Sequence, residues 1–151
     1  MQHQCFCDMN IITRPMQVSD TPAVNKLAAQ LGYPDTIIET QKRIASLQQQ
    51  AGHCLLVATE GDLVIGWLHA VKMTWLETGD FVEIAGLVVD ELHRSKQVGA
   101  LLVEAVKTWS LQQECSRIIA RSNVRRSRAH QFYLRHGFTE TKESKVFELH
   151  C

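Results

Sequence analysis

The stretch from Leu87 to Ala100 holds the residues whose types and spacing most clearly suggest chemistry. A buried strand is predicted to end at Val89, a polar loop follows, and a helix is predicted to begin at about Gly99. Backbone N–H groups at a helix start, together with the helix dipole, form an anion site without any particular side chain. A loop that curls there directs further N–H groups at one phosphate, and Gly99 allows a pyrophosphate to approach closely. The pattern indicates a phosphate-binding loop, although an ordinary strand-to-helix loop gives the same spacing.

The sequence argues against two common phosphate-loop types and one class of partner. It contains neither the G-x-x-x-x-G-K-[ST] pattern of a Walker A loop nor the G-x-G-x-x-G pattern of a dinucleotide fold. Its 16 Lys and Arg residues balance its 16 Asp and Glu residues. A net charge of zero argues against a dedicated nucleic-acid binder, which usually carries a basic excess.

Two titratable side chains lie in strand-like surroundings where they could exchange protons. Glu83 is the acid within the apolar run Phe81–Leu87, and such surroundings can raise a carboxyl pKa to suit a general base. A solvent-facing strand position or a buried hydrogen-bond acceptor explains Glu83 equally well. His69 is a second candidate base, because the alternation of side chains along Trp67–Ala70 could place it near the same cleft as Glu83. A lone histidine on a strand is more often structural.

Apolar strands and amphipathic helices must position these residues. The runs that read as strands are Ile11–Arg14, Cys54–Thr59, Leu63–Trp75, Phe81–Val89, Arg117–Ser122, Phe138–Glu140 and Lys145–Leu149. Helical stretches run from the expected N-cap Ser19 to Gly32, from Thr36 to about Gln50, from about Gly99 to Gln113 and from Ser127 to His136. This order predicts an α/β (α+β) mixed sheet with helices on both faces. A right-handed crossover would make Phe81–Val89 and Arg117–Ser122 parallel neighbours.

Two segments resemble motifs of the GNAT superfamily of N-acetyltransferases. Arg94–Gly99 follows the family's pyrophosphate loop [Q/R]-x-x-G-x-[G/A], except that Gln97 replaces the middle glycine. If that position requires a positive φ, Gln97 would strain the loop or shift it. Asn123–Phe138 is similar to the family's Asn…Ala-x-x-Phe-Tyr-x-x-x-Gly-Phe segment. The resemblance covers Ile11 to Leu149, and Glu83–Phe138 looks especially like bacterial aminoglycoside-6′-acetyltransferase-like members.

The resemblance implies a GNAT-type acyl-CoA N-acyltransferase fold, a mostly antiparallel sheet with a central, splayed parallel strand pair. It implies that β-strand backbone pairs with the pantetheine arm of acetyl-CoA, and that the Val88 N–H polarises the thioester carbonyl. Tyr133 matches the family's general acid, and some members use a glutamate at the position of Glu83 as the base. The residues implied to bind the cofactor are Leu87, Val88, Val89, Arg94, Ser95, Lys96, Gln97, Val98, Gly99, Ala100, Asn123, Ala129 and Phe132.

The acceptor side is less specific. Tyr33, Trp67 and His69 are candidates for binding the acceptor substrate, but core packing or a dimer surface explains the aromatic residues as well. The sequence also carries an arginine cluster near its second motif, which could meet the 3′-phosphate of CoA or form a solvated surface. The cluster consists of Arg121, Arg125, Arg126 and Arg128.

Length and cysteine usage set the domain and compartment expectations. Of the 151 residues, 1–10 are expected to be a flexible extension and 11–151 a single GNAT domain. The five cysteines are irregularly spaced, so reduced thiols, a cytoplasmic location and no membrane segment are expected. His3, Cys5 and Cys7 could suggest a metal, but a structural zinc site needs four ligands, so no metal is expected.

The sequence therefore predicts an enzyme that transfers the acetyl group of acetyl-CoA to a primary amine of a small molecule or protein. Attack would be direct, within a ternary complex. The alternative is a catalytically weak CoA-binding regulatory module, which only Gln97 supports; nucleic-acid binding through the arginine cluster is a third hypothesis. A homodimer is also expected, with the apolar segment Val146-Phe147 at its interface.

Overall fold

The computed structural model describes residues 10–151, which form two compact units. The first unit ends at Ala120 and the second spans Arg121–Cys151; each is described on its own. His3, Cys5 and Cys7, and with them most of the expected N-terminal extension, lie outside the described residues. The single domain over residues 11–151 stays a prediction.

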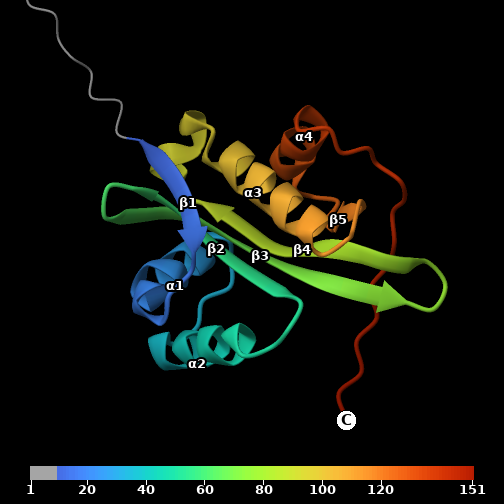
Figure 1. The fold of residues 1–151 in the computed structure, drawn as a ribbon, viewed down its shortest axis with the longest axis horizontal. Helices are drawn as coiled ribbons and strands as arrows, with labels where there is room; N and C mark the ends of the chain where they lie inside the picture. The colour runs from blue at the N-terminus through green and yellow to red at the C-terminus, as the bar shows by residue number, and fades with distance from the viewer. Residues whose placement is uncertain (1–9) are drawn as a thin grey trace, which may run out of the picture. The chain divides into compact units, whose positions relative to one another are not determined.

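A five-stranded mixed sheet forms the centre of the first unit (Figure 1). Its strands are β1 (Ile11–Pro15), β2 (His53–Glu60), β3 (Leu63–Trp75), β4 (Gly79–Val89) and β5 (Ile118–Ala120), in that spatial order. β1 to β4 are antiparallel neighbours, and β4 and β5 are parallel. The mixed sheet and its parallel pair confirm the predicted fold class.

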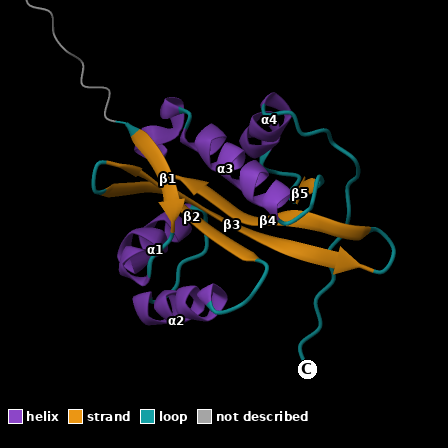
Figure 2. Cartoon of the chain, viewed as in Figure 1, coloured by secondary structure: helices purple, strands orange, loops and turns teal. Residues whose placement is uncertain are grey.

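Helices cover both faces of this sheet (Figure 2). They are α1 (Thr21–Gln30) and α2 (Ile37–Gln48) on one face and α3 (Val98–Gln112) on the other. On the first face, Val57 of β2 packs in a buried cluster with Val24 of α1 and Ile44 of α2. On the other face, Gly66 of β3 lies so close to α3 that an added Cβ would meet Val98 Cγ1 at 3.1 Å. A larger residue would force its neighbours to shift by a few tenths of an ångström, so glycine suits this close approach of strand and helix.

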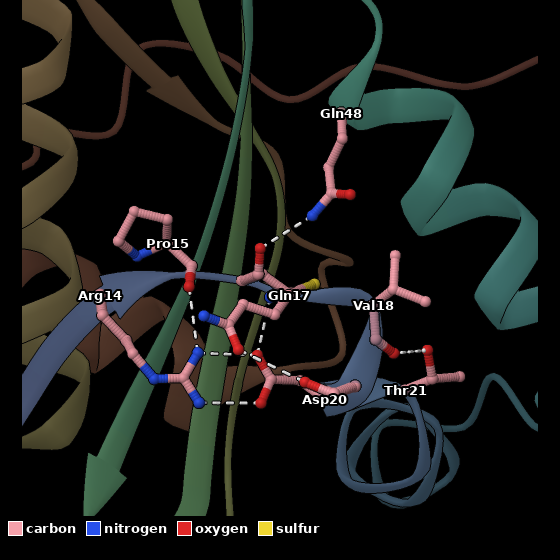
Figure 3. A network of polar contacts seen from close by, with 9 residues as sticks. Arg14, Pro15, Gln17, Val18, Asp20, Thr21 and Gln48 are labelled. Atoms are coloured by element: carbon pink, nitrogen blue, oxygen red, sulfur yellow. Dashed lines mark hydrogen bonds and ion pairs between the residues drawn. The ribbon is translucent and has the colours of Figure 1, made fainter.

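The start of α1 differs from the prediction. Ser19 belongs to a short 3₁₀ segment, η1 (Val18–Asp20), and its hydroxyl donates to the Gln17 side chain instead of capping the helix. The carboxylate of Asp20 is held by the Arg14 guanidinium through two bonds of 2.8 Å, and it accepts the Gln17 N–H (Figure 3). This ion pair fixes the connection from β1 to α1. The capping interaction predicted for α2 is present, because the Thr36 hydroxyl accepts the Glu39 N–H.

The second unit contains one described helix, α4 (Ser127–Arg135), and its later residues form no strand. The strands predicted over Phe138–Glu140 and Lys145–Leu149 are therefore wrong for the described structure. Their apolar residues satisfy strand propensity, but a strand also needs a hydrogen-bonded neighbour, and no ladder pairs them within residues 10–151. β5 is consequently the end strand of the sheet, and it is shorter and less buried than predicted.

Candidate functional site

β4 becomes irregular where the resemblance expects an open slot. His69 of β3 lies opposite Gly86, and Ala70 lies opposite Ile84, so Ala85 is the extra residue of a β-bulge. The parallel ladder to β5 ends where Ile84 pairs with Ala120, whereas β4 continues to Val89. The bulge and the end of β5 leave residues 85–89 of β4 unpaired by β5.

The direction of the backbone N–H groups identifies which residues face this unpaired side. The Asp90 N–H, just past β4, donates to the Ile65 carbonyl of β3 at 2.8 Å. Because N–H groups alternate in direction along a strand, the Val88 N–H also points toward β3, where Val88 lies opposite Trp67. The N–H groups of Leu87 and Val89 point to the side that β5 does not cover. The Val88 N–H, which the resemblance implied as the donor to the thioester carbonyl, therefore points toward β3, and Leu87 and Val89 carry the outward N–H groups.

The loop after β4 forms a 3₁₀ segment and then an unusual residue. η2 spans Glu91–Lys96, and Gln97 follows with φ 59° and ψ 25°, which is the left-handed conformation. The family motif has glycine at this position, so the backbone takes the positive φ even though a side chain is present. Of the two expected consequences of Gln97, strain in the loop or a shift of the loop, this geometry corresponds to strain.

The start of α3 presents backbone donors. The first intrahelical bond runs from the Leu101 N–H to the Gln97 carbonyl, at 3.2 Å. The N–H groups of Val98, Gly99 and Ala100 precede it, and the side chain of the N-cap residue Gln97 does not cap them. Arg94 is exposed, and the side chains of Ser95 and Lys96 lie outside the described part. This helix start can accommodate an anion through its backbone alone.

Three titratable side chains share one face of the sheet. In the register, His53, Val71 and Glu83 lie side by side on β2, β3 and β4, and His69 is two residues from Val71. Partners directly opposite share a face, as do residues two apart along a strand, so His53, His69 and Glu83 all lie on the face covered by α1 and α2. The predicted proximity of His69 to the Glu83 side of the sheet is consistent with this register.

His53 and His69 form a direct pair that the sequence analysis missed. His53 Nδ1 and His69 Nε2 are 2.9 Å apart, so one imidazole donates and the other accepts. Burial, and secondarily the charge of His53, lower the pKa of His69 from its ordinary value. His69 is therefore neutral at physiological pH and able to accept a proton. Register alone could have suggested the pair, but the sequence does not give the register of β2 against β3.

The two aromatic candidates for the acceptor wall lie in different surroundings. The indole of Trp67 covers Gly86, where an added Cβ would meet the ring at 2.8 Å, and it packs against the core cluster under α1 and α2. Trp67 Nε1 is buried and has no hydrogen-bond partner among the described residues. Tyr33 is 66% exposed in the loop between α1 and α2. Core packing therefore accounts for most contacts of the Trp67 indole, whereas the Tyr33 side chain is accessible to a ligand.

The second unit holds the remaining motif residues around α4. Tyr133 contacts Phe132 and Phe138 edge to face, with ring centroids 5.4 and 5.1 Å apart. Gly137, with φ 88°, allows the chain to turn back so that Phe138 reaches Tyr133. Burial raises the pKa of Tyr133, and the nearby Arg126 opposes that shift. The phenol consequently stays protonated above its ordinary range.

Asn123 and Ala129 complete the motif in this unit. The Asn123 side-chain oxygen accepts the Arg125 N–H at 2.9 Å, and its backbone carbonyl accepts from the Arg126 N–H and the His130 ring. These bonds build the turn that leads into α4. Ala129 is half-buried on that helix.

The sequence model of the Acetyltransferase (GNAT) family matches residues 21–138, which is more than half of the chain. The protein belongs to the GNAT acetyltransferase family. The match spans both motifs from which the resemblance was inferred, and it confirms that inference. No curated protein matches the sequence of this GNAT protein.

Solved structures share the GNAT fold of this chain. A GNAT acetyltransferase from Staphylococcus aureus is 24% identical with a TM-score of 0.78, covering 93% of this chain and 100% of its own. The aminoglycoside 6′-N-acetyltransferase AAC(6′)-Ih from Acinetobacter baumannii is 21% identical with a TM-score of 0.83. The match covers 94% of this chain and 99% of that enzyme's chain. The aminoglycoside N-acetyltransferase AAC(6′)-Iy in complex with CoA is 18% identical with a TM-score of 0.85. The match covers 94% of this chain and 96% of that enzyme's chain. Aminoglycoside acetyltransferases are thus among the fold neighbours, as expected.

The described residues also bear on metal binding and on membrane insertion. No group of three or more His, Cys, Asp or Glu side chains there could hold a metal ion. None of the described helices has both the length and the apolar character needed to cross a bilayer.

Proposed function

We propose that this GNAT protein transfers the acetyl group of acetyl-CoA to a primary amine, by direct attack within a ternary complex. One observation carries the proposal: beyond the end of β5 one edge of β4 is left unpaired, and the 3₁₀ loop that follows β4 leads to a helix start whose first N–H groups make no intrahelical bond. Residues 85–89 of β4 extend beyond β5, and the N–H groups of Val98–Ala100 follow a left-handed Gln97. A ligand with an amide-containing arm and a pyrophosphate has the chemistry to use both features.

In this proposal the backbone of β4 binds the pantetheine arm and the start of α3 binds the pyrophosphate. Leu87 and Val89 supply outward N–H groups, one of which polarises the thioester carbonyl. Asn123, Ala129 and Phe132 are the further cofactor-binding residues that the family motif implies. The Asn123 oxygen is engaged by Arg125, so its amide N–H₂ is the end available to a ligand carbonyl.

Tyr133 is the proposed general acid. Departure of CoA produces a thiolate, which must gain a proton, while the attacking amine must lose one. A phenol whose pKa is raised by burial stays protonated in the working range and can donate to the thiolate. Its packing against Phe132 and Phe138 fixes the ring orientation.

The proposed base is Glu83, with His69 as the second candidate. Both lie on the face covered by α1 and α2. Glu83 would take the amine proton directly or through water, and the Tyr133 phenol would give a different proton to the thiolate. The lowered pKa of His69 keeps that imidazole neutral, which is the form a base needs.

The acceptor is proposed to be a small-molecule or protein amine. The structure of AAC(6′)-Iy with a bisubstrate analogue of CoA and acetylneamine favours a small molecule among these classes. Tyr33, Trp67 and His69 are the proposed acceptor-binding residues, and the accessible Tyr33 is the best placed to contact a ligand. Polyamines, aminoglycosides, amino acids and protein amines are the classes to test.

The alternative, a catalytically weak CoA-binding module, rested on Gln97. Because Gln97 takes the conformation that glycine would take, the structure gives this alternative no added support. The proposal also includes a cytoplasmic location, where the free thiols of Cys54, Cys115 and Cys151 would stay reduced.

Binding measurements with CoA fragments test the cofactor site. We expect calorimetry to show that acetyl-CoA, CoA and dephospho-CoA all bind, because all three carry the pyrophosphate. Pantetheine lacks it and should bind far more weakly. Equal affinity for pantetheine and CoA would contradict a pyrophosphate site at Arg94–Ala100.

A further inference from the structure

The last residue of α1 reaches across to the loop that follows β4. Gln30 Nε2 donates to Asp90 Oδ1 at 3.1 Å, and Gln30 Oε1 accepts the Glu91 N–H at 3.3 Å. Both ends of one side-chain amide are therefore used on two consecutive loop residues, about 60 positions away in the sequence. No motif signal marks Gln30 in the sequence.

Asp90, the residue that Gln30 holds, is the fixed entry to this loop. Its N–H donates to Ile65 of β3, and its carbonyl accepts the His93 N–H at 2.9 Å. Its second carboxylate oxygen lies 2.7 Å from His93 Nδ1. The hydrogen bond from Gln30 is the largest cause of the lowered pKa of Asp90, so the carboxylate is ionised and accepts strongly at neutral pH.

The loop beyond Asp90 needs such an anchor because it ends in a disfavoured conformation. Gln97 is left-handed, a conformation that is unfavourable for a residue with a side chain. A disfavoured conformation persists only where the surrounding structure holds it. The bonds at Asp90 and Glu91 fix one end of this short loop, and α3 fixes the other.

We propose that Gln30 is a positioning residue that holds the backbone of the pyrophosphate loop and so makes α1 part of the acetyl-CoA site. The inference rests on the proposed cofactor site at Arg94–Ala100. Gln30 does not touch the cofactor in this scheme; it acts through Asp90 and Glu91 on the N–H groups further along the loop. Loss of its two bonds would allow the loop to sample conformations that do not bind pyrophosphate.

Gln48 offers a matched control. It is the last residue of α2, as Gln30 is the last residue of α1, and its Nε2 donates to the Met16 carbonyl at 2.8 Å (Figure 3). Gln48→Ala thus removes a partly buried, long-range glutamine bond of similar kind without touching the loop. Both alanine variants should lower the melting temperature to a similar, small extent.

Calorimetric titration of the full chain with acetyl-CoA tests the inference. Gln30→Ala should bind acetyl-CoA about fivefold to tenfold more weakly than wild type, the loss expected for about one hydrogen bond, and Gln48→Ala should bind like wild type. In a double-mutant cycle, Gln30→Ala combined with Asp90→Ala should weaken acetyl-CoA binding by less than the sum of the two single changes, because both remove the Gln30–Asp90 bond.

Two results would overturn the inference, and they differ from failure of the proposed function. Equal affinity of wild type and Gln30→Ala refutes the positioning role, as do fully additive losses in the cycle. A wild-type chain that melts cooperatively but binds no acetyl-CoA refutes the proposed cofactor site, and this inference with it.

Discussion

Gln97 shows how one residue can depart from a family motif while the backbone keeps the conformation of the motif. Its φ of 59° is where glycine would be relaxed, so the side chain adds strain. We expect Gln97→Gly to raise the free energy of unfolding by up to about 1 kcal/mol, with part of the relief lost to the greater chain entropy of glycine. Urea unfolding measures this, and a loss of stability would contradict it.

Glu114 provides the comparison, because it is a second non-glycine residue with positive φ, at 60°. It lies beyond the far end of α3 from the loop. Glu114→Gly should stabilise the chain similarly while leaving acetyl-CoA affinity unchanged. Gln97→Gly should bind acetyl-CoA at least as well as wild type.

The His53–His69 pair predicts a shifted titration. NMR should give His69 a pKa below the ordinary 6.5, because burial and the charge of His53 both disfavour its protonated form. His53→Gln should raise that pKa only part of the way, since burial is the larger cause and remains. The unfolded chain binds this proton more readily, so the His69 contribution to stability is lost as pH falls below 6.5. A His69 pKa at or above 6.5 would refute the pair geometry.

The roles proposed for Tyr133 and Glu83 are separable by kinetics. Tyr133→Phe keeps the ring packing, so it should lower turnover on the order of a hundredfold or more with acetyl-CoA affinity nearly intact. The raised Tyr133 pKa predicts that the alkaline limb of wild-type activity lies above the ordinary phenol value of 10.0. Glu83→Gln should remove the acidic limb of the pH–rate profile.

A different result would contradict each of the two proposed roles. Full turnover in Tyr133→Phe would exclude this phenol as the acid. An unchanged acidic limb in Glu83→Gln would move the base to His69 or to a water held by backbone groups.

At the level of elements, the sequence predicted most of the first unit because its signals there are local. The bounds of β3 agree with the predicted Leu63–Trp75, since the turn at Gly61 and the long apolar alternation mark both ends. The first helix cap was wrong because Asp20, not Ser19, makes the decisive contact, and its partner Arg14 lies on another element. The parallel pair followed from crossover handedness, whereas the splaying of that pair was implied only by the family resemblance.

Less of the candidate site than of the fold was predictable from the sequence. Arg94–Ala100 could be found because glycine and charge mark a loop before a helix. Gln30 and His53 could not, since both act through long-range pairs that depend on register and packing. The direction of the Val88 N–H was not predictable either, because it depends on which residue after β4 faces Ile65.

The Arg14–Asp20 pair predicts how the connection from β1 to α1 contributes to stability. Asp20 is 7% exposed and accepts three hydrogen bonds, so Asp20→Asn should cost about 2 kcal/mol at pH 7 in urea unfolding. The Arg14 hydrogen bond lowers the pKa of Asp20, so its contribution is present above the ordinary 3.8 and is lost as pH falls through the lowered value. The difference in the free energy of unfolding between wild type and Asp20→Asn should therefore become smaller below about pH 4.

An exposed ion pair supplies the control. Asp35 pairs with Arg43 at the surface, where solvent screens the charges, so Asp35→Asn should lower the free energy of unfolding by clearly less than Asp20→Asn does. Equal losses for the two variants would contradict the importance assigned to burial of Asp20.

At the scale of the whole molecule, the C-terminal segment around Val146 and Phe147 is where we expect two copies of the chain to form a dimer. Val146 and Phe147 are 90% and 89% exposed and belong to no strand among the described residues, which fits a segment that a second copy covers. Sedimentation should show a dimer at micromolar concentration, and Val146→Lys with Phe147→Lys should shift it to monomer. Leu76, exposed on the β3–β4 turn, provides the control: Leu76→Lys should stay dimeric. A wild-type monomer would remove this prediction.

Release of free CoA thiol over a panel of primary amines tests the central claim most directly. The wild-type chain is incubated with acetyl-CoA and, in turn, a polyamine, an aminoglycoside, an amino acid and a peptide with a free amine, and the thiol is followed with a colorimetric reagent. Because acetyl transfer frees one thiol for each amine acetylated, the account predicts release that needs both acetyl-CoA and one of these amines, and that falls on the order of a hundredfold in Tyr133→Phe. Thiol release no faster than hydrolysis with every amine, by a chain that binds acetyl-CoA, would contradict it.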